Sequence, residues 1–298
     1  MAPRRITSQA VTRETLVSGN TGFRSILGVD VGERYLDLAA LDLRRRRLRF
    51  GRVDLATPSD RRRIETIAGA LAEFGVGPMT LALVDSPQAP RQSAERPREI
   101  DRELYRVVRE LNAESGRATR LSMFPTPTAS YFVACASDVH CPAHLRSIAR
   151  EIFGRGRAHG ATPPVGGQIF TRFMLSGFAA HRAFGLLGAD VFESYPFLAF
   201  ELWRDEDREM LPPKGRARDA LASRVAILIR LARELQLGEF QKPEKLDQAD
   251  AAALATTAAV ALAGGRLIRV EAPREGRFAL ALPRTSVVSE CRPLAQNT

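Results

Sequence analysis

The sequence predicts an α/β protein built on a mixed sheet, in which three antiparallel strands are followed by parallel strands, with flanking helices. Three apolar runs, at 26–29, 35–41 and 48–55, follow one another closely with short turn segments between them, which indicates an antiparallel meander. A helical pattern over 59–74 then leads to the apolar run 79–84, as expected for a crossover helix and a further buried strand. In mixed sheets of this kind, functional sites gather at strand ends.

The rest of the chain alternates between helical and extended patterns. Further helices are expected at 99–114, 167–186, 196–203, 216–235 and 247–263, and further strands at 189–193, 266–270 and 278–282. Residues 1–23 are polar and basic, and residues 120–165 mix short apolar stretches with prolines and glycines. The expected organisation is therefore a flexible basic leader over 1–23, a single domain over 24–285 with an irregular insertion near 120–165, and a tail over 286–298.

The charge of the chain favours a polyanionic partner. Its 298 residues include 44 Lys and Arg against 34 Asp and Glu, a net charge of +10. Counterion release makes such an excess attractive to nucleic acid, either DNA or RNA. Arginine abundance unrelated to binding would give the same excess, so charge alone leaves nucleic-acid contact open.

The composition and cysteine pattern indicate a folded cytoplasmic protein. With 45% hydrophobic and 26% charged residues, the chain has the composition of a globular protein. Its 3 cysteines have no regular spacing, which argues against a disulfide framework. No run of about 18 apolar residues occurs, so a membrane partner is not expected.

Acidic residues recur where an apolar strand ends or a helix begins. They are Asp30, Asp85, Glu193 and Asp250, with Asp247 one helical turn before Asp250. If the fold brings them together, their repulsion requires cations, and hard carboxylate oxygens select Mg²⁺ or Mn²⁺. In a two-metal arrangement, Asp30 on its central strand would bridge the ions and the other acids would complete the metal site. Taken singly, each acid also has an ordinary interpretation as a turn former or helix cap, so the prediction depends on their convergence.

Seven short segments occur in a characteristic order along the chain. They are Gly28-Val29-Asp30-Val31-Gly32, Val84-Asp85-Ser86-Pro87, Arg98-Glu99-Ile100-Asp101-Arg102-Glu103-Leu104, Phe124-Pro125-Thr126-Pro127, Val191-Phe192-Glu193-Ser194-Tyr195-Pro196, Asp247-Gln248-Ala249-Asp250-Ala251 and Glu275-Gly276. In this order they resemble the domain of unknown function 429 family, whose members are predicted nucleases of ribonuclease H-like fold. The resemblance spans most of residues 25–285. It implies a metal site formed by Asp30, Asp85, Glu193 and Asp250, with Asp101, Arg102, Lys214 and Arg218 as charged neighbours or substrate contacts.

The leading hypothesis is therefore a divalent-metal-dependent nuclease of ribonuclease H-like type that hydrolyses phosphodiester bonds. In it, the acids hold Mg²⁺ or Mn²⁺ while Arg102, Lys214 and Arg218 hold the nucleic-acid backbone. The alternative is a non-catalytic nucleic-acid-binding or scaffold protein that keeps the fold and its basic surface. Phosphoryl transfer from ATP ranks lowest, because the sequence has no paired glycine-rich phosphate loops.

Overall fold

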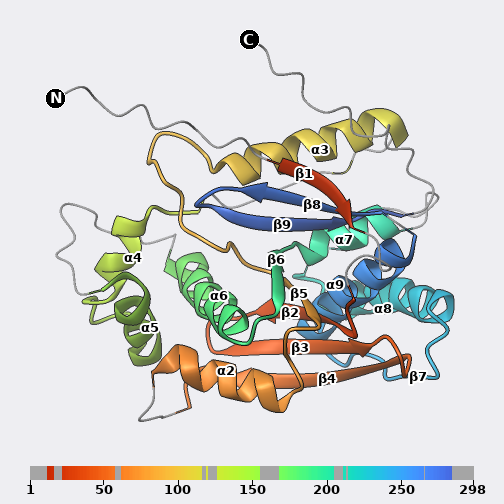
Figure 1. Cartoon of the computed structure of the whole chain (residues 1–298), viewed down its shortest axis with the longest axis horizontal. Coiled ribbons are helices and arrows are strands. Elements are labelled where there is room, and N and C mark those ends of the chain that lie inside the picture. Colours follow the sequence, from red (N-terminus) through yellow and green to blue (C-terminus); the bar gives the residue numbers. More distant parts are fainter. Residues whose placement is uncertain are drawn as a thin grey trace.

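A single mixed sheet runs through the protein (Figure 1). The computed structural model describes residues 12–16, 22–57, 62–115, 119, 126–154, 168–204, 211–212, 214–264 and 266–283. Its strands are β1 (Thr12–Leu16), β2 (Ser25–Val31), β3 (Tyr35–Asp42), β4 (Arg47–Asp54), β5 (Thr80–Val84), β6 (Asp190–Glu193), β7 (Glu239–Phe240), β8 (Leu267–Ala272) and β9 (Gly276–Ala281). They lie in the order β1-β8-β9-β6-β5-β2-β3-β4-β7.

The strand directions confirm a mixed sheet in which three antiparallel strands are followed by parallel ones. Strand β3 pairs antiparallel with both β2 and β4, which forms the meander. On the other side of β2, strand β5 pairs with it in parallel, β6 pairs in parallel with β5, and β9 in parallel with β6. Because β2 and β5 run in the same direction, their carboxyl ends meet at one edge of the sheet, where ligand sites form in α/β proteins.

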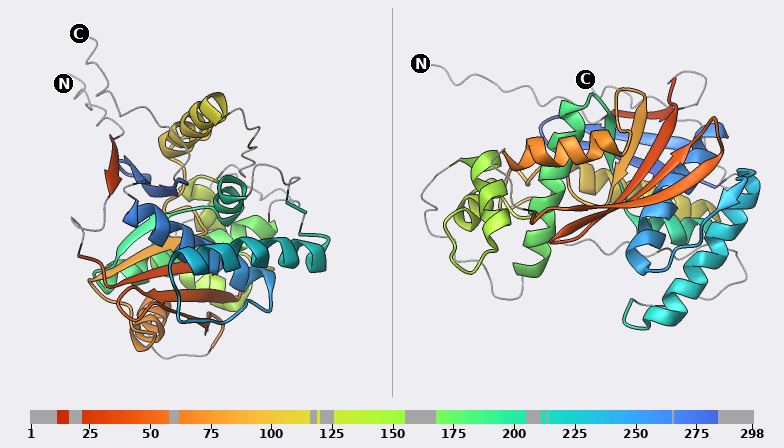
Figure 2. Two further views of the ribbon diagram at one scale, coloured as in Figure 1. Left: turned by 90° about the vertical axis from the view of Figure 1, so that its right-hand side faces the viewer. Right: turned by 90° about the horizontal axis from the view of Figure 1, so that it is seen from below.

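Helices cover both faces of the sheet, which is twisted (Figure 2). They are α2 (Arg63–Glu73), α3 (Glu99–Ser115), α4 (Ala129–Cys135), α5 (Ala143–Phe153), α6 (Gln168–Leu186), α7 (Pro196–Trp203), α8 (Ala217–Glu234) and α9 (Leu246–Ala263). Helices α2, α4, α5 and α6 share one hydrophobic core with the sheet, and α3, α7, α8 and α9 share the other. Among the described helices, none combines the length and hydropathy needed to cross a bilayer.

The strand sequences explain why both faces need cover. In β3, Leu36 and Leu38 are buried in one core, whereas Ala39 and Leu41 are buried in the other, because successive side chains of a strand point to opposite faces. All five residues of β5 are buried, as expected for a parallel strand enclosed on both sides. The result is a three-layer α/β arrangement of helices, sheet and helices.

Two regions differ from the expectation drawn from the sequence. Residues 12–16, within the expected leader over 1–23, form β1, which pairs antiparallel with β8. The expected irregular insertion near 120–165 contains the helices α4 and α5, and Pro127 and Pro142 precede these helices instead of marking continuous loop. The tail over 286–298 lies outside the described residues, as do residues 1–11 and 17–21 of the leader and most of the loops of the insertion.

Candidate functional site

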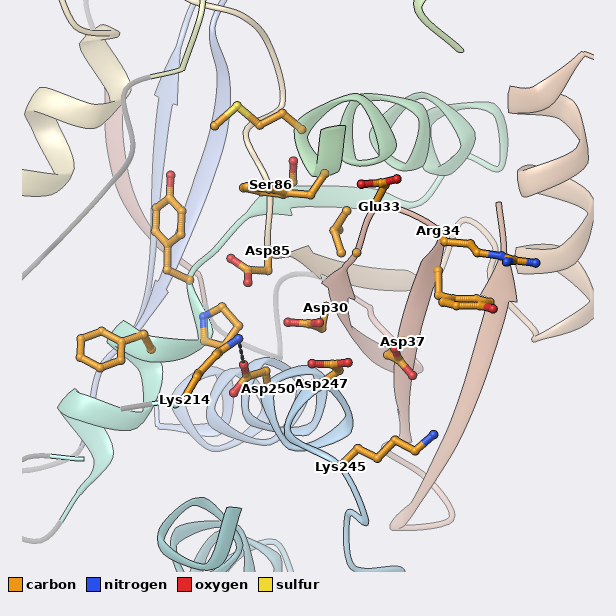
Figure 3. Close-up of a pocket in the computed structure, with 18 of the residues that line it drawn as sticks. Asp30, Glu33, Arg34, Asp37, Asp85, Ser86, Lys214, Lys245, Asp247 and Asp250 are labelled. Carbon is orange, nitrogen blue, oxygen red and sulfur yellow. Dashed lines mark ion pairs between the residues drawn. The ribbon is translucent and has the colours of Figure 1, made fainter. Parts of the chain in front are cut away.

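A pocket of about 910 Å³ lies at the carboxyl ends of β2 and β5. Acidic residues from three separate parts of the chain line it: Asp30, Asp85, Asp247 and Asp250, here called the acidic cluster. Their carboxylates face a common space (Figure 3). The structure thus brings together four of the five acids that the sequence singled out.

The first two acids are positioned by the pairing of the two central parallel strands. Asp30 is the penultimate residue of β2, and Asp85 directly follows β5. The backbone N–H of Asp85 donates to the carbonyl of Val29 at 2.9 Å, which continues the ladder and sets the two acids side by side. Asp30 is 8% exposed and has no hydrogen-bond or ion-pair partner among the described residues, although it points into the pocket.

The other two acids arrive on α9, which packs very closely on β2. A Cβ atom at Gly28 would stand 1.9 Å from the carbonyl oxygen of Ala251, so the helix backbone lies directly against the strand. The alanine-rich body of α9 permits this approach because it has almost no side-chain bulk. Asp247 and Asp250, three positions apart in the helix, therefore share the face that meets Asp30.

Burial and mutual repulsion shape the electrostatics of the cluster. Burial, reinforced by the charges of Asp85 and Asp250, raises the pKa of Asp30 well above its ordinary value. Burial and then Asp250 raise the pKa of Asp85 to about 7. Carboxyl groups with such shifts are stabilised in their charged form when a cation lies between them.

Asp250 is the one member of the cluster with cationic partners in the described structure. The Nζ atom of Lys214 lies 2.6 Å from Oδ2 of Asp250, and Nε of Arg224 donates to Oδ1 at 3.1 Å. Arg224 is 1% exposed and also donates to the carbonyl of Ala220, so it is a fixed charge of the interior. Although burial disfavours the ammonium, Asp250 and Asp30 raise the pKa of Lys214 above its ordinary value.

Asp37 is a further acid of the pocket, which the sequence analysis missed. It lies opposite Asp30 in the β2–β3 pairing, where like charges destabilise a sheet. Arg52, opposite Asp37 on β4, relieves this repulsion by donating to both carboxylate oxygens at 2.9 and 2.8 Å. An acid within an otherwise apolar strand was the signal that could have identified it.

Glu193, expected in the metal site, does not line the pocket. Its carboxylate accepts from Nη1 and Nη2 of Arg98 at 2.9 and 2.6 Å, and from the hydroxyl of Tyr195 at 2.5 Å. Arg98 also donates to Asp101, at 3.0 Å through Nε. Glu193 and Arg98 are each 1% exposed, so Glu193 is part of a buried ion-pair network.

Only one of the three basic residues expected to contact substrate lies at the pocket. Lys214 lines the pocket, whereas Arg102 and Arg218 do not. Arg102 lies 3.6 Å from Glu99 on the exposed side of α3, and Arg218 is exposed in the first turn of α8. The other basic residues at the pocket are Arg34, Arg52 and Lys245, none of which the sequence analysis selected.

The acidic cluster offers the carboxylate oxygens that a hard divalent cation prefers, but its members are spread too far apart to share an ion as they stand. Within the part of the chain that the structure describes, no three acidic, histidine or cysteine side chains stand close enough to share a metal ion. Like charges separate when no cation lies between them, and carboxylate oxygens are the ligands that Mg²⁺ and Mn²⁺ prefer. The buried, unpartnered carboxylate of Asp30 is the group that such an ion would satisfy.

Comparisons with protein-family models and with curated proteins find no match to this chain. The function is therefore inferred from the pocket and its position in the fold.

Proposed function

We propose that this pocket is the active site of a divalent-metal-dependent nuclease that hydrolyses phosphodiester bonds in nucleic acid. The observation that carries the proposal is the convergence of the acidic cluster from β2, from the end of β5 and from α9 onto one pocket. Repulsion between the carboxylates destabilises such a cluster unless a cation is bound. Metal ions held by carboxylates are common in enzymes that catalyse phosphoryl chemistry.

The topology supports a ribonuclease H-like fold for the domain. The order β4-β3-β2-β5-β6, antiparallel in its first half and parallel in its second, matches what the resemblance to the domain of unknown function 429 family implies. Fold alone does not define function, since one fold hosts many activities. The acids supply the chemical support for the proposed activity: Asp30 lies on the central strand and Asp250 on the last long helix.

In the proposed mechanism, the side chains of Asp30, Asp85 and Asp247 would draw together around Mg²⁺ or Mn²⁺, because in the described structure they stand too far apart to share an ion. The bound metal would supply Lewis acidity and lower the pKa of a water molecule. Asp30 keeps its place because a central strand fixes its backbone, and Asp247 keeps its place because α9 lies against Gly28. Buried Arg224 holds the carboxylate of Asp250 in place, and Asp250 in turn holds the ammonium of Lys214 at the pocket.

The rest of the pocket suits a nucleic-acid substrate. Tyr35 presents an aromatic ring with the guanidinium groups of Arg34 and Arg52 at 5.4 and 4.7 Å from its centroid. Phe173 and Phe197 add apolar lining on the walls contributed by α6 and α7. Aromatic rings stack on bases while cations attract phosphates, so the pocket offers both kinds of contact beside the acids.

The direct test is hydrolysis of labelled DNA and RNA in the presence of Mg²⁺ or Mn²⁺. Wild type should cleave one of these substrates, and Asp30→Asn should lose the activity. Asp42→Asn is the matched control, because Asp42 ends the neighbouring strand β3 and does not line the pocket. Equal cleavage by wild type and Asp30→Asn, or none by either across a broad panel, would overturn the proposal. Retained nucleic-acid binding without metal binding would identify a binding module instead.

A further inference from the structure

Helix α7 places an exposed aromatic ring at the pocket. Every other residue of this helix is buried, whereas Phe197 is 40% exposed and lines the pocket. Burial of an aromatic ring stabilises a fold, so packing within the protein does not account for an exposed one. The other exposed large hydrophobic side chains of the described residues do not line the pocket; they are Met79, Tyr105, Val139 and Leu186. Among the aromatic rings of the pocket, Phe197 is thus the one most open to a ligand.

Two exposed cations stand on opposite sides of the acidic cluster, Lys214 and Arg34 (Figure 3). Their side chains are 57% and 59% exposed. The ammonium of Lys214 has three donors, of which the contact with Asp250 at 2.6 Å needs only one. The guanidinium of Arg34 has five donors and lies 3.7 Å from Asp54. Each cation can therefore still bind a phosphate oxygen, one on each side of the cluster.

The acids lie deeper than these two cations. Asp30 is 8% exposed and Asp250 is 2% exposed, so a phosphate that reacts at the cluster must enter the pocket. The pocket, at about 910 Å³, has the size of a small-molecule site. A duplex has a persistence length of about 50 nm and keeps its bases paired inside, so it can neither bend into such a pocket nor offer a base to Phe197. An unpaired strand is flexible, and its bases are free to stack on an aromatic ring.

We infer that the substrate is a single-stranded nucleic acid, with one base stacked on Phe197 and its phosphates held by Lys214 and Arg34 on either side of the acidic cluster. This inference rests on the proposed function, from which it takes nucleic acid as the ligand, and it names the form that the pocket accepts. Phosphate contacts carry no sequence information, and an aromatic ring stacks on any base. The pocket is therefore expected to bind unpaired strands with little regard to their sequence.

Binding of labelled oligonucleotides to the full chain tests the inference without measuring catalysis. One DNA and one RNA sequence are used, each as a single strand and annealed to its complement, and fluorescence anisotropy is followed with Ca²⁺ in place of Mg²⁺, because Ca²⁺ also takes carboxylate oxygens. A gel checks that the oligonucleotides stay intact. Wild type should bind a single strand at least about tenfold more tightly than its duplex.

Variants of the exposed ring separate stacking from general attraction. Phe197→Ala should weaken single-strand binding about tenfold, whereas Phe197→Trp keeps an aromatic ring and should bind like wild type. Phe197 is exposed, so these variants keep the core, and thermal unfolding checks that they are folded. Tyr105→Ala is the matched control, because Tyr105 is 46% exposed on α3 and does not line the pocket. Lys214→Met should weaken binding and reduce the number of released counterions by about one.

The outcomes distinguish the inference from the proposed function. Equal affinity for single strand and duplex, or unchanged single-strand binding in Phe197→Ala, would overturn the inference and leave the proposed function to the hydrolysis assay. Preferred binding of single strands that depends on Phe197, without hydrolysis in Mg²⁺ or Mn²⁺, would support the single-stranded ligand and overturn the nuclease activity. No binding of any oligonucleotide in Ca²⁺, in Mg²⁺ or in a chelator would overturn both.

Discussion

The backbone of Gly28 lies against the carbonyl oxygen of Ala251, so closely that a Cβ atom at position 28 would stand 1.9 Å away. This contact joins the central strand to α9. It brings Asp247 and Asp250 within reach of Asp30 and thus assembles the acidic cluster from distant parts of the chain.

Gly28→Ala should therefore damage both the fold and the metal site. The added methyl must push α9 away from β2, and the loss of stability should reach or exceed the about 3 kcal/mol at the upper end of ordinary overpacking. Urea unfolding and Mn²⁺ affinity should both fall. Gly69→Ala is the control, because Gly69 is exposed in α2 with open space around it, and alanine there should raise stability by up to about 1 kcal/mol. A Gly28→Ala protein with unchanged stability would contradict the close contact.

Asp85 should make the metal-free protein less stable as the pH rises. Burial, with a contribution from Asp250, raises its pKa to about 7 from 3.8 in the unfolded chain. Between these values the folded protein holds the proton that the unfolded chain has released, so the free energy of unfolding falls with increasing pH. Asp85→Asn should have a shallower slope, the remainder coming from Asp30, and should exceed wild type in stability at about pH 8 in the presence of a chelator. The same pH dependence in both proteins, measured by urea unfolding, would refute the assignment.

Glu193 should prove to be a structural residue. Arg98→Met leaves the carboxylate of Glu193 buried without its cation, which should cost about 3–5 kcal/mol of stability. Glu193→Gln should also lower stability but leave Mn²⁺ affinity unchanged, because Glu193 does not line the pocket. Calorimetry and urea unfolding on the same samples distinguish the two effects. If Glu193→Gln lowered the Mn²⁺ affinity and kept full stability, Glu193 would be a residue of the metal site.

His181 should make the protein sensitive to acid. Burial lowers its pKa to about 4 from 6.5, and the neutral ring donates through Nε2 to the carbonyl of Ser86 at 3.0 Å. As the pH falls between those values, the unfolded chain takes up a proton that the folded protein does not, so stability decreases. His181→Gln keeps a donor and removes the titration. Chemical unfolding across this range should show a shallower loss for the variant, and parallel curves would exclude His181 as the cause.

The elements that the sequence predicted correctly are those whose pattern is local. Strand β5 was expected at 79–84 and spans Thr80–Val84, because a buried parallel strand is apolar throughout. Helix α7 has the expected bounds, with Pro196 at its first turn. Strand β1 has the sequence TRETL and becomes a strand only through its pairing with β8. No single-segment pattern contains that information.

The residues of the site show the same difference between local patterns, which could be predicted, and long-range contacts, which could not. Asp30 and Asp85 were identifiable because each follows a run of apolar residues, and Asp250 because it stands in the first turns of an apolar helix. The partners of Glu193 were not identifiable, since Arg98 is 95 positions away and the ion pair exists only in the folded sheet. An acid at a strand end is thus predicted to lie near a site. Whether it faces the pocket or forms a buried ion pair depends on a partner residue that is distant in sequence.

The short pairing of β7 with β4 has a consequence for how copies of the chain meet. In the described structure, β7 covers only Arg47 and Leu48 of β4, which leaves most of this strand at the border of the sheet. An open strand border is a template for pairing with another chain and for aggregation. Exposed Arg49 lies on the uncovered part of β4. A charged side chain on an open strand border opposes its pairing with the same border of a second copy.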